Sequence, residues 1–200
     1  VGKDTTIKSY RPNFPMQHWQ IDLIDYSQTK FPGNSQYVYI VVIIDIFSKF
    51  VYIHPSKNKL GCTIASILKK LFLSGDIPRV LGSDNGPEFI NHEVEKVCND
   101  FNVLQISSLP HRPMTQGFVE NKNKQIKAYI QMHMAKYKDN TWYDLIDKIS
   151  FSLNNTQHSV TKLTPLEVHR GRKNPVEMLQ KSQLFNLGNR DGNIEGVLLS

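Results

Sequence analysis

Residues 37–53, YVYIVVIIDIFSKFVYI, decide the fold, because two runs of β-branched and aromatic residues flank the short segment DIFS at 45–48. That segment is long enough only for a turn, so the pattern predicts a β-hairpin. Asp45 is expected to accept backbone hydrogen bonds within this turn rather than to bind a metal. The longest apolar run, 37–44, spans eight residues, whereas a membrane-spanning helix needs about 20. The sequence therefore favours a buried hairpin and excludes a transmembrane protein.

The segments on either side of the hairpin predict an α/β domain. Hydrophobic alternation and helical periodicity predict strands at 18–26, 77–82 and 103–107 and helices at 63–73, 93–101, 118–138 and 142–153. This order implies a mixed sheet flanked by helices. We expect an N-terminal arm or linker at 1–14, a single core domain at 15–172 and a C-terminal connector at 173–200.

Composition bounds the class of protein. Among 200 residues, 24 Lys and Arg against 18 Asp and Glu give a net charge of +6, which favours a polyanionic partner such as nucleic acid. Charge alone supports an ordinary basic protein equally well. Cys62 and Cys98 provide neither a disulfide framework nor, with seven histidines, the spacing of a zinc site. The chain begins with Val1 and shows no signal peptide, so we expect an intracellular fragment of a longer protein.

Three acidic residues are candidates for a catalytic or metal-binding site. Asp22 lies within the first strand, Asp84 directly follows the fourth, and Glu120 lies near the start of a long helix. Because side chains alternate along a strand, Asp22 and Asp25 point to opposite faces, and one of them can share a site with Asp84. Acids gathered at one crevice repel one another unless cations compensate. Hard oxygen ligands select Mg²⁺ or Mn²⁺, and two such ions form a phosphoryl-transfer site.

Five sequence blocks carry a family resemblance. The blocks WQID at 19–22, GSDNGPEF at 82–89 and QGFVE at 116–120 resemble the catalytic core of retroviral-type integrases. Asp84 and Glu120 are separated by 35 residues, as in that family's D,D-35-E signature. The turn DIFSK at 45–49 and LTPLE at 163–167 are also similar, so the resemblance covers 15–172. It implies the core of a retrotransposon, retrovirus or Polinton-type integrase.

The resemblance also implies a structure and a reaction. The fold would be ribonuclease H-like, a five-stranded mixed sheet with helices on both faces. Asp22, Asp84 and Glu120 would be both the catalytic residues and the ligands of two Mg²⁺ or Mn²⁺ ions when DNA is bound. Water would process the 3′ end of the element's DNA, and the freed 3′-OH would attack target DNA. We expect a homodimer or higher oligomer, no membrane partner, and action in the nucleus; the sequence identifies no host tethering factor.

Further residues are expected at the DNA. On the predicted helix Lys124 and Lys127 follow Glu120 at i+4 and i+7 and share its face, which suits either phosphate binding or a solvated surface. The loop at 108–117 is expected to close on DNA about a hinge at Gly117, although an ordinary polar connection fits the same residues. The other candidate DNA contacts are Asn85, His111, Arg112 and Gln116.

Two other functions remain open. Many relatives follow the catalytic Glu with Arg-x-Asn, whereas this chain has Asn121-Lys122-Asn123. A domesticated integrase-like domain that binds DNA or protein without catalysis is one alternative, and a metal-dependent nuclease of the same fold is the other. The intact acids favour an enzyme, and the LTPLE segment favours an integrase.

Overall fold

The computed structural model describes residues 12–29, 36–107, 113–137, 141–159 and 161–171. Five strands form one sheet: β1 (His18–Asp25), β2 (Tyr39–Asp45), β3 (Val51–Ser56), β4 (Val80–Ser83) and β5 (Leu104–Ser107). The helices are α1 (Gly61–Leu73), α2 (His92–Asp100), α3 (Pro113–Tyr137), η1 (Tyr143–Leu145), α4 (Ile146–Asn155) and α5 (Pro165–His169). Within these ranges no helix is both long and apolar enough to cross a membrane. The predicted arm and connector fall almost wholly outside the described residues.

The sheet is mixed, as the sequence predicted. Its strand order is β3-β2-β1-β4-β5; β2 is antiparallel to both β1 and β3, while β1, β4 and β5 run parallel. The β2–β3 hairpin is confirmed, with Ile44 opposite Val51 across the turn. The parallel strands are reached through α1 and α2, since a parallel connection needs a crossover element. This topology makes β1 an inner strand with β2 and β4 on its two sides.

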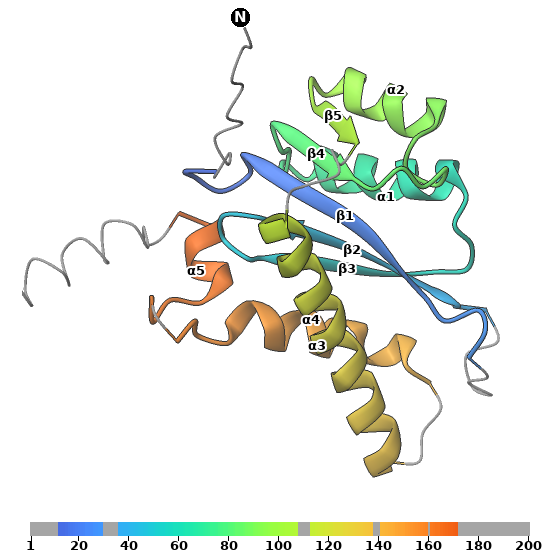
Figure 1. Ribbon diagram of the computed structural model, residues 1–200, viewed down its shortest axis with the longest axis vertical. Helices are drawn as coiled ribbons and strands as arrows, with labels where there is room; N and C mark the ends of the chain where they lie inside the picture. The colour runs from blue at the N-terminus through green and yellow to red at the C-terminus, as the bar shows by residue number, and fades with distance from the viewer. Residues whose placement is uncertain (1–11, 30–35, 108–112, 138–140, 160, 172–200) are drawn as a thin grey trace, which may run out of the picture.

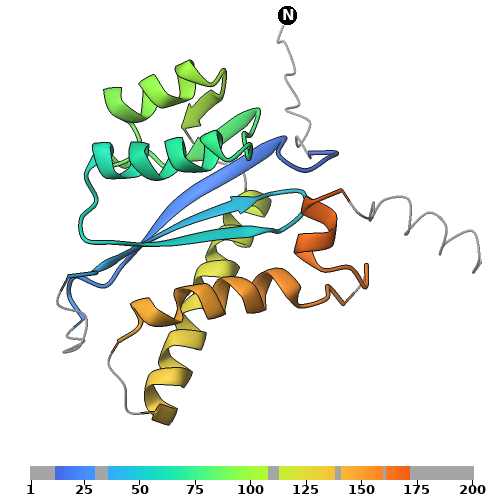
Figure 2. The same ribbon diagram turned by 180° about the vertical axis from the view of Figure 1, so that it is seen from behind.

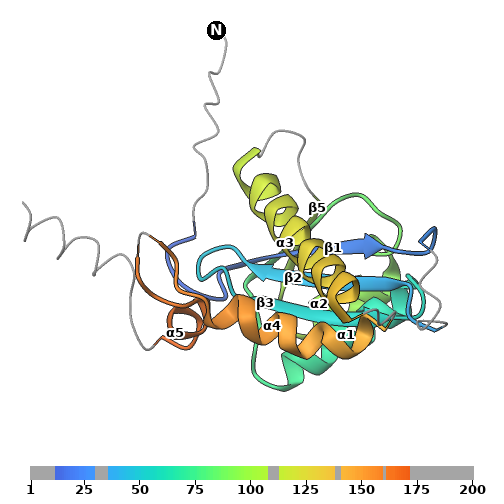
Figure 3. The same cartoon turned by 90° about the horizontal axis from the view of Figure 1, so that it is seen from below.

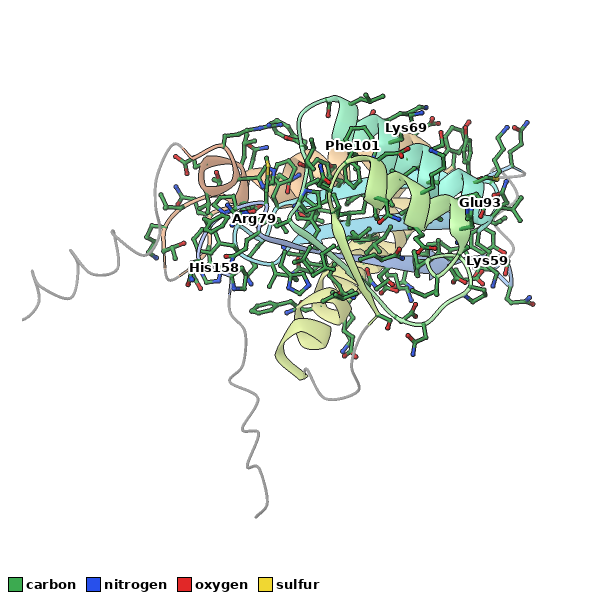
Figure 4. All side chains as sticks on the ribbon, turned by 90° about the horizontal axis from the view of Figure 1, so that it is seen from above. Lys59, Lys69, Arg79, Glu93, Phe101 and His158 are labelled. Atoms are coloured by element: carbon green, nitrogen blue, oxygen red, sulfur yellow. The ribbon has the colours of Figure 1, made fainter. Side chains whose placement is uncertain are left out.

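Helices cover both faces of the sheet. Figures 1 and 2 show α1 and α2 on one face and α3, α4 and α5 on the other. Because both faces are covered, β2 is buried almost throughout, and its residues alternate between two cores: Val41 and Ile43 pack with α1 and α2, and Ile40, Val42 and Ile44 pack with α3 and α4. Phe101, labelled in Figure 4, packs edge-on against Phe72 of α1, with ring centroids 5.4 Å apart.

Asp45 holds the β2–β3 turn. Its carboxylate is fully buried and accepts hydrogen bonds from Met16 N (2.5 Å), Trp19 Nε1 (3.1 Å) and the backbone and hydroxyl of Ser48 (2.7 and 2.9 Å). The predicted role of a turn acid is therefore confirmed. Ser48 Oγ lies 3.1 Å from His169 Nδ1, so the same network fixes α5 beside the hairpin, where Figure 3 shows it.

Asn154 of α4 closes the outer edge of β3 near the turn. Its Nδ2 donates to Val51 O and its Oδ1 accepts from Val51 N, both at 2.8 Å. The carboxamide thus makes the pair of hydrogen bonds that a neighbouring strand would make. Asn154 is 5% exposed, so both backbone groups of Val51 are satisfied away from water.

Three predicted boundaries differ from the structure. Helix α3 begins at Pro113, five residues before the predicted start at 118, and Gly117 therefore lies inside a helix rather than at a hinge. Proline is tolerated in the first helical turn, because its missing N–H has no intrahelical partner there, and one glycine costs a helix only about 1 kcal/mol. β4 begins at Val80 rather than at 77, and a 3₁₀ turn precedes α4.

Replacing Asn154 with Ala should destabilise the domain by about 2–4 kcal/mol, because both backbone groups of Val51 would lose their partner in a buried position. Urea denaturation measures this change. The matched control is Asn155→Ala: Asn155 is exposed and donates only to Phe151 O within its own helix. Equal losses in the two variants would contradict the role assigned to Asn154.

Candidate active site

Strand register brings two of the three predicted acids together. In the parallel pair of β1 and β4, Trp19 lies opposite Leu81 and Gln20 opposite Gly82. Continuing this register by two residues places Asp22 beside Asp84, the first residue after β4. Residues opposite one another in a ladder point to the same face of the sheet, so both carboxylates face the same way. The two charges interact, since Asp84 contributes to raising the pKa of Asp22.

Asp22 is half-buried and bonded to helix α3. Its Oδ2 accepts from Asn123 Nδ2 at 2.6 Å, and its Oδ1 accepts from Leu23 N at 2.8 Å. Burial is the largest cause that raises the pKa of Asp22, and the two hydrogen bonds and the nearby Lys127 oppose it. The charged form of Asp22 is therefore disfavoured in the free protein, and a bound cation would stabilise it.

Asp84 occupies a tight turn and is exposed. Its Oδ1 accepts from Gly86 N at 3.0 Å, which closes a short side-chain turn. A Cβ on residue 86 would lie 3.0 Å from that oxygen and 2.9 Å from Cδ of Glu88. Gly86 therefore lets the turn approach the carboxylate closely and keeps Asp84 directed outward.

Glu120 lies on α3, three residues before Asn123 and seven before Lys127. It is exposed and is not among the charged groups that shift the pKa of Asp22. In the described part of the chain no three His, Cys, Asp or Glu residues are close enough to hold a metal together. The structure thus brings Asp22 and Asp84 together and places Glu120 on the adjoining helix, short of the three-acid cluster that the sequence predicted.

The donor set nevertheless suits a divalent cation. Asp22 and Asp84 supply carboxylate oxygens, and the buried Oδ1 of Asn123 has no hydrogen-bond partner. Buried polar atoms without partners are rare in folded proteins. An acceptor oxygen left over beside paired carboxylates is the type of ligand that Mg²⁺ and Mn²⁺ prefer.

Comparison with known proteins identifies the family of this chain. A model of the family described as "Integrase core domain" matches residues 12–113, just over half of the chain. The chain belongs to the integrase core domain family. This confirms the retroviral-type resemblance that the sequence blocks indicated.

Relatives and solved structures agree with that membership. The integrase core is 30% identical over 176 residues to the Gag-Pol polyprotein of feline leukemia virus, covering 88% of this chain and 10% of the polyprotein. It is 29% identical over 160 residues to the Pro-Pol polyprotein of feline foamy virus, covering 80% and 13%. This chain therefore spans about a tenth of the length of these relatives. An alignment over 88% of the chain necessarily includes Glu120, which lies beyond the span of the family model.

The solved structures confirm the ribonuclease H-like fold. A chain of the simian T-cell lymphotropic virus intasome, in complex with PP2A regulatory subunit B56 gamma, superposes with a TM-score of 0.70 at 20% identity, covering 81% of this chain and 57% of that chain. The HTLV-2 integrase catalytic core domain, in complex with magnesium and in dimeric form, superposes with a TM-score of 0.64 at 25% identity, covering 80% and 99%. The predicted five-stranded mixed sheet is thus shared with these cores.

The remaining candidate residues of the integrase core are placed unevenly. Lys127 lies near enough to Asp22 to lower its pKa, while Lys124 and Asn85 are exposed. Gln116 belongs to the first turns of α3, but its side chain is outside what the structure describes, as are His111 and Arg112. Asn123 was missed by the sequence analysis, although its i+3 spacing from Glu120 places it on the adjoining helix face. Of the cysteines, Cys98 is buried and Cys62 is exposed.

Replacing Asp22 with Asn should stabilise the metal-free protein by about 0.5–2 kcal/mol, because the change removes a half-buried charge that Asp84 repels. Urea denaturation at pH 7 in the presence of a chelator measures the gain.

The control for this substitution is Asp25→Asn. The exposed Asp25 accepts from Ser27 N at 2.7 Å, and hydrogen bonding to Ser27 lowers its pKa, so its loss should bring no gain in stability. A similar gain in both variants would count against a charge conflict at Asp22.

Divalent cations should stabilise the wild-type protein. At ten times the dissociation constant, a ligand that binds only the folded state adds about 1.4 kcal/mol. We expect melting temperature to rise with MnCl₂ in wild type and in Glu95→Gln, an exposed acid on α2. Asp84→Asn should lose the rise, and an unchanged rise in that variant would exclude Asp84 as a ligand.

Proposed function

We propose that this integrase core is a divalent-metal-dependent polynucleotidyl transferase that processes the 3′ ends of a mobile element and joins them to target DNA. The observation that carries the proposal is the β1–β4 register, which sets Asp22 beside Asp84 under the helix that bears Glu120. Membership of the integrase core family supports the same reaction class. Asp22, Asp84 and Glu120 are the proposed catalytic residues.

The same three acids are the proposed ligands of two Mg²⁺ or Mn²⁺ ions in the DNA complex. When bound, such ions supply Lewis acidity at the scissile phosphate and stabilise the attacking and leaving oxygens. The solved HTLV-2 core is in complex with magnesium, which supports divalent metal use here.

The protein's own groups then orient the reaction. Asn123 fixes the rotamer of Asp22 through the hydrogen bond between Nδ2 and Oδ2, and Lys127 offsets the paired negative charges. No side chain forms a covalent intermediate. Water attacks near the 3′ end in the first step, and the freed 3′-OH attacks the target phosphodiester in line in the second. One site serves both steps because the two reactions differ only in the nucleophile.

DNA binding is proposed to use exposed groups around the acids. Lys124, Lys127 and Asn85 are proposed to contact phosphates. His111 and Arg112, from the segment before α3, and Gln116 of α3 are proposed to complete the contact. A net charge of +6 over 200 residues supports binding that weakens as salt is raised.

The active form is proposed to be a homodimer or higher oligomer that acts in the nucleus. The HTLV-2 core was solved in dimeric and trimeric forms, and the simian T-cell lymphotropic virus chain in an intasome.

The proposal is tested with a branched DNA that mimics the strand-transfer product, incubated with Mg²⁺ or Mn²⁺. We expect metal-dependent cutting and rejoining that falls at least 10²-fold in Glu120→Gln, since the carboxylate charge is lost without change of shape. Glu95→Gln, an exposed acid of α2, should retain full activity.

The products separate the alternatives. Cutting without rejoining would identify the nuclease, and no reaction by a folded wild-type protein or a longer chain would favour the domesticated binding domain. Equal activity in wild type and Glu120→Gln would remove Glu120 from the site.

A further inference from the structure

Lys49 makes an unusual contact at the end of the β2–β3 turn. The residue has a left-handed backbone, with φ of 65°, and its N–H donates to Asp45 O at 2.9 Å. Its ammonium folds back over the turn, donates to Ile46 O at 2.5 Å and lies 3.3 Å from the centroid of the Phe118 ring. Lys49 therefore links the turn that Asp45 fixes to helix α3.

Phe118 is two residues before Glu120 on α3. At 100° per residue, Phe118 and Asn123 lie on opposite flanks of the apolar stripe formed by Val119, Ile126 and Ile130. Asn123 is bonded to β1 on one flank, and Phe118 is held by Lys49 on the other. These two contacts bracket the helical turn that carries Glu120 and connect it to different parts of the sheet.

Lys49 lies in surroundings that are largely shielded from water, where a contact with an aromatic ring contributes more to stabilising its charge. The ammonium is largely buried, and burial lowers the pKa of Lys49 to about 8; Asp45 opposes this shift and Lys122, on α3, adds to it. No ion pair to Lys49 is found within the described ranges. Its charge is therefore stabilised by the Ile46 carbonyl, the Phe118 ring and the more distant attraction of Asp45, and cation–π attraction is strongest where water is excluded.

We propose that Lys49 is a positioning residue: by holding Phe118, it sets where α3 presents Glu120 to the paired aspartates. This rests on the proposed function, because the consequence of misplacing Glu120 is measured on the reaction. The residue itself touches neither substrate nor metal ligand. A misplacement of about 1 Å can cost a reaction of this type 10²-fold in rate.

The first test compares Lys49→Met with Lys57→Met. Lys57 is exposed, and its ammonium lies 5.5 Å from the Tyr37 ring, so the control also removes one lysine and one weaker ring contact. On branched DNA we expect Lys49→Met to lower the single-turnover rate at saturating DNA about tenfold, the magnitude of a desolvated cation–π contact. The DNA concentration for half-maximal rate should change less than twofold, and Lys57→Met should match wild type.

A second variant, Phe118→Leu, tests the pair rather than the lysine alone. Phe118 is 38% exposed, so the change leaves the core intact. Because both single variants remove the same contact, the double variant should be no slower than the slower single variant. Multiplication of the two rate losses would overturn the proposed pair, as would equal slowing by Lys57→Met.

Rescue by arginine provides a readout that simple packing would not move. Lys49→Arg keeps a cation at every pH used, whereas Lys49 loses its charge as the pH rises through about 8. The ratio of the Lys49→Arg rate to the wild-type rate should therefore increase between pH 7 and pH 9. Asp45 and Lys122, the charged groups that act on residue 49, are present in both proteins, so their own effects on the rate divide out of the ratio. A flat ratio would overturn the role of the charge.

Amide hydrogen exchange separates this inference from the proposed function. Lys49→Met should speed exchange in residues 117–124 of α3 and leave α1 unchanged, whether or not the protein is active. If the wild-type protein is inactive but exchange in 117–124 is still faster in Lys49→Met, the proposed function is overturned and the contact between Lys49 and Phe118 is supported. Unchanged exchange in 117–124 would overturn the inference even in an active protein.

Discussion

The buried carboxylate of Asp45 is the constraint on which this half of the molecule depends. A carboxyl group away from water is tolerated only when its oxygens are hydrogen-bonded, and Asp45 obtains those partners from β1, the turn and the segment before β1. The turn can then take only one form. That form starts β3 in register, gives Lys49 its left-handed backbone and presents Ser48 to His169. Removing one of these donors would leave a buried carboxyl oxygen short of a hydrogen bond.

The geometry of the candidate site follows from the neighbouring pair of strands, β1 and β4. Parallel register alone makes Asp22 and Asp84 adjacent, at the edge of the α3-covered face. The protein thereby holds two like charges close together in the free state, which costs stability and prepares the site for cations. Hydrophobic burial in the two apolar cores on either side of the sheet offsets this loss of stability.

Sequence reasoning succeeded where a single element determines the outcome. The hairpin and the order of strands and helices follow from period-two alternation and helical periodicity. Alternation left Asp22 and Asp25 as alternatives, and the family blocks selected Asp22. The start of α3 was missed, because Pro113 and Gly117 are local breakers that the surrounding helix overrides. Asn123 and Lys49 were also missed as site residues, since their roles depend on side chains reaching between distant segments. Such contacts have no periodicity in the sequence.

The carboxamide of Asn154 has a consequence for how copies of this domain can meet. A free sheet edge recruits further strands, either from a partner or in cross-β aggregates. At Val51 those hydrogen bonds are already taken by the domain's own helix. Growth of a continuous sheet from one copy to the next is therefore blocked at this point of β3. Assemblies that form at this point of β3 must therefore join through side-chain surfaces rather than through backbone hydrogen bonds.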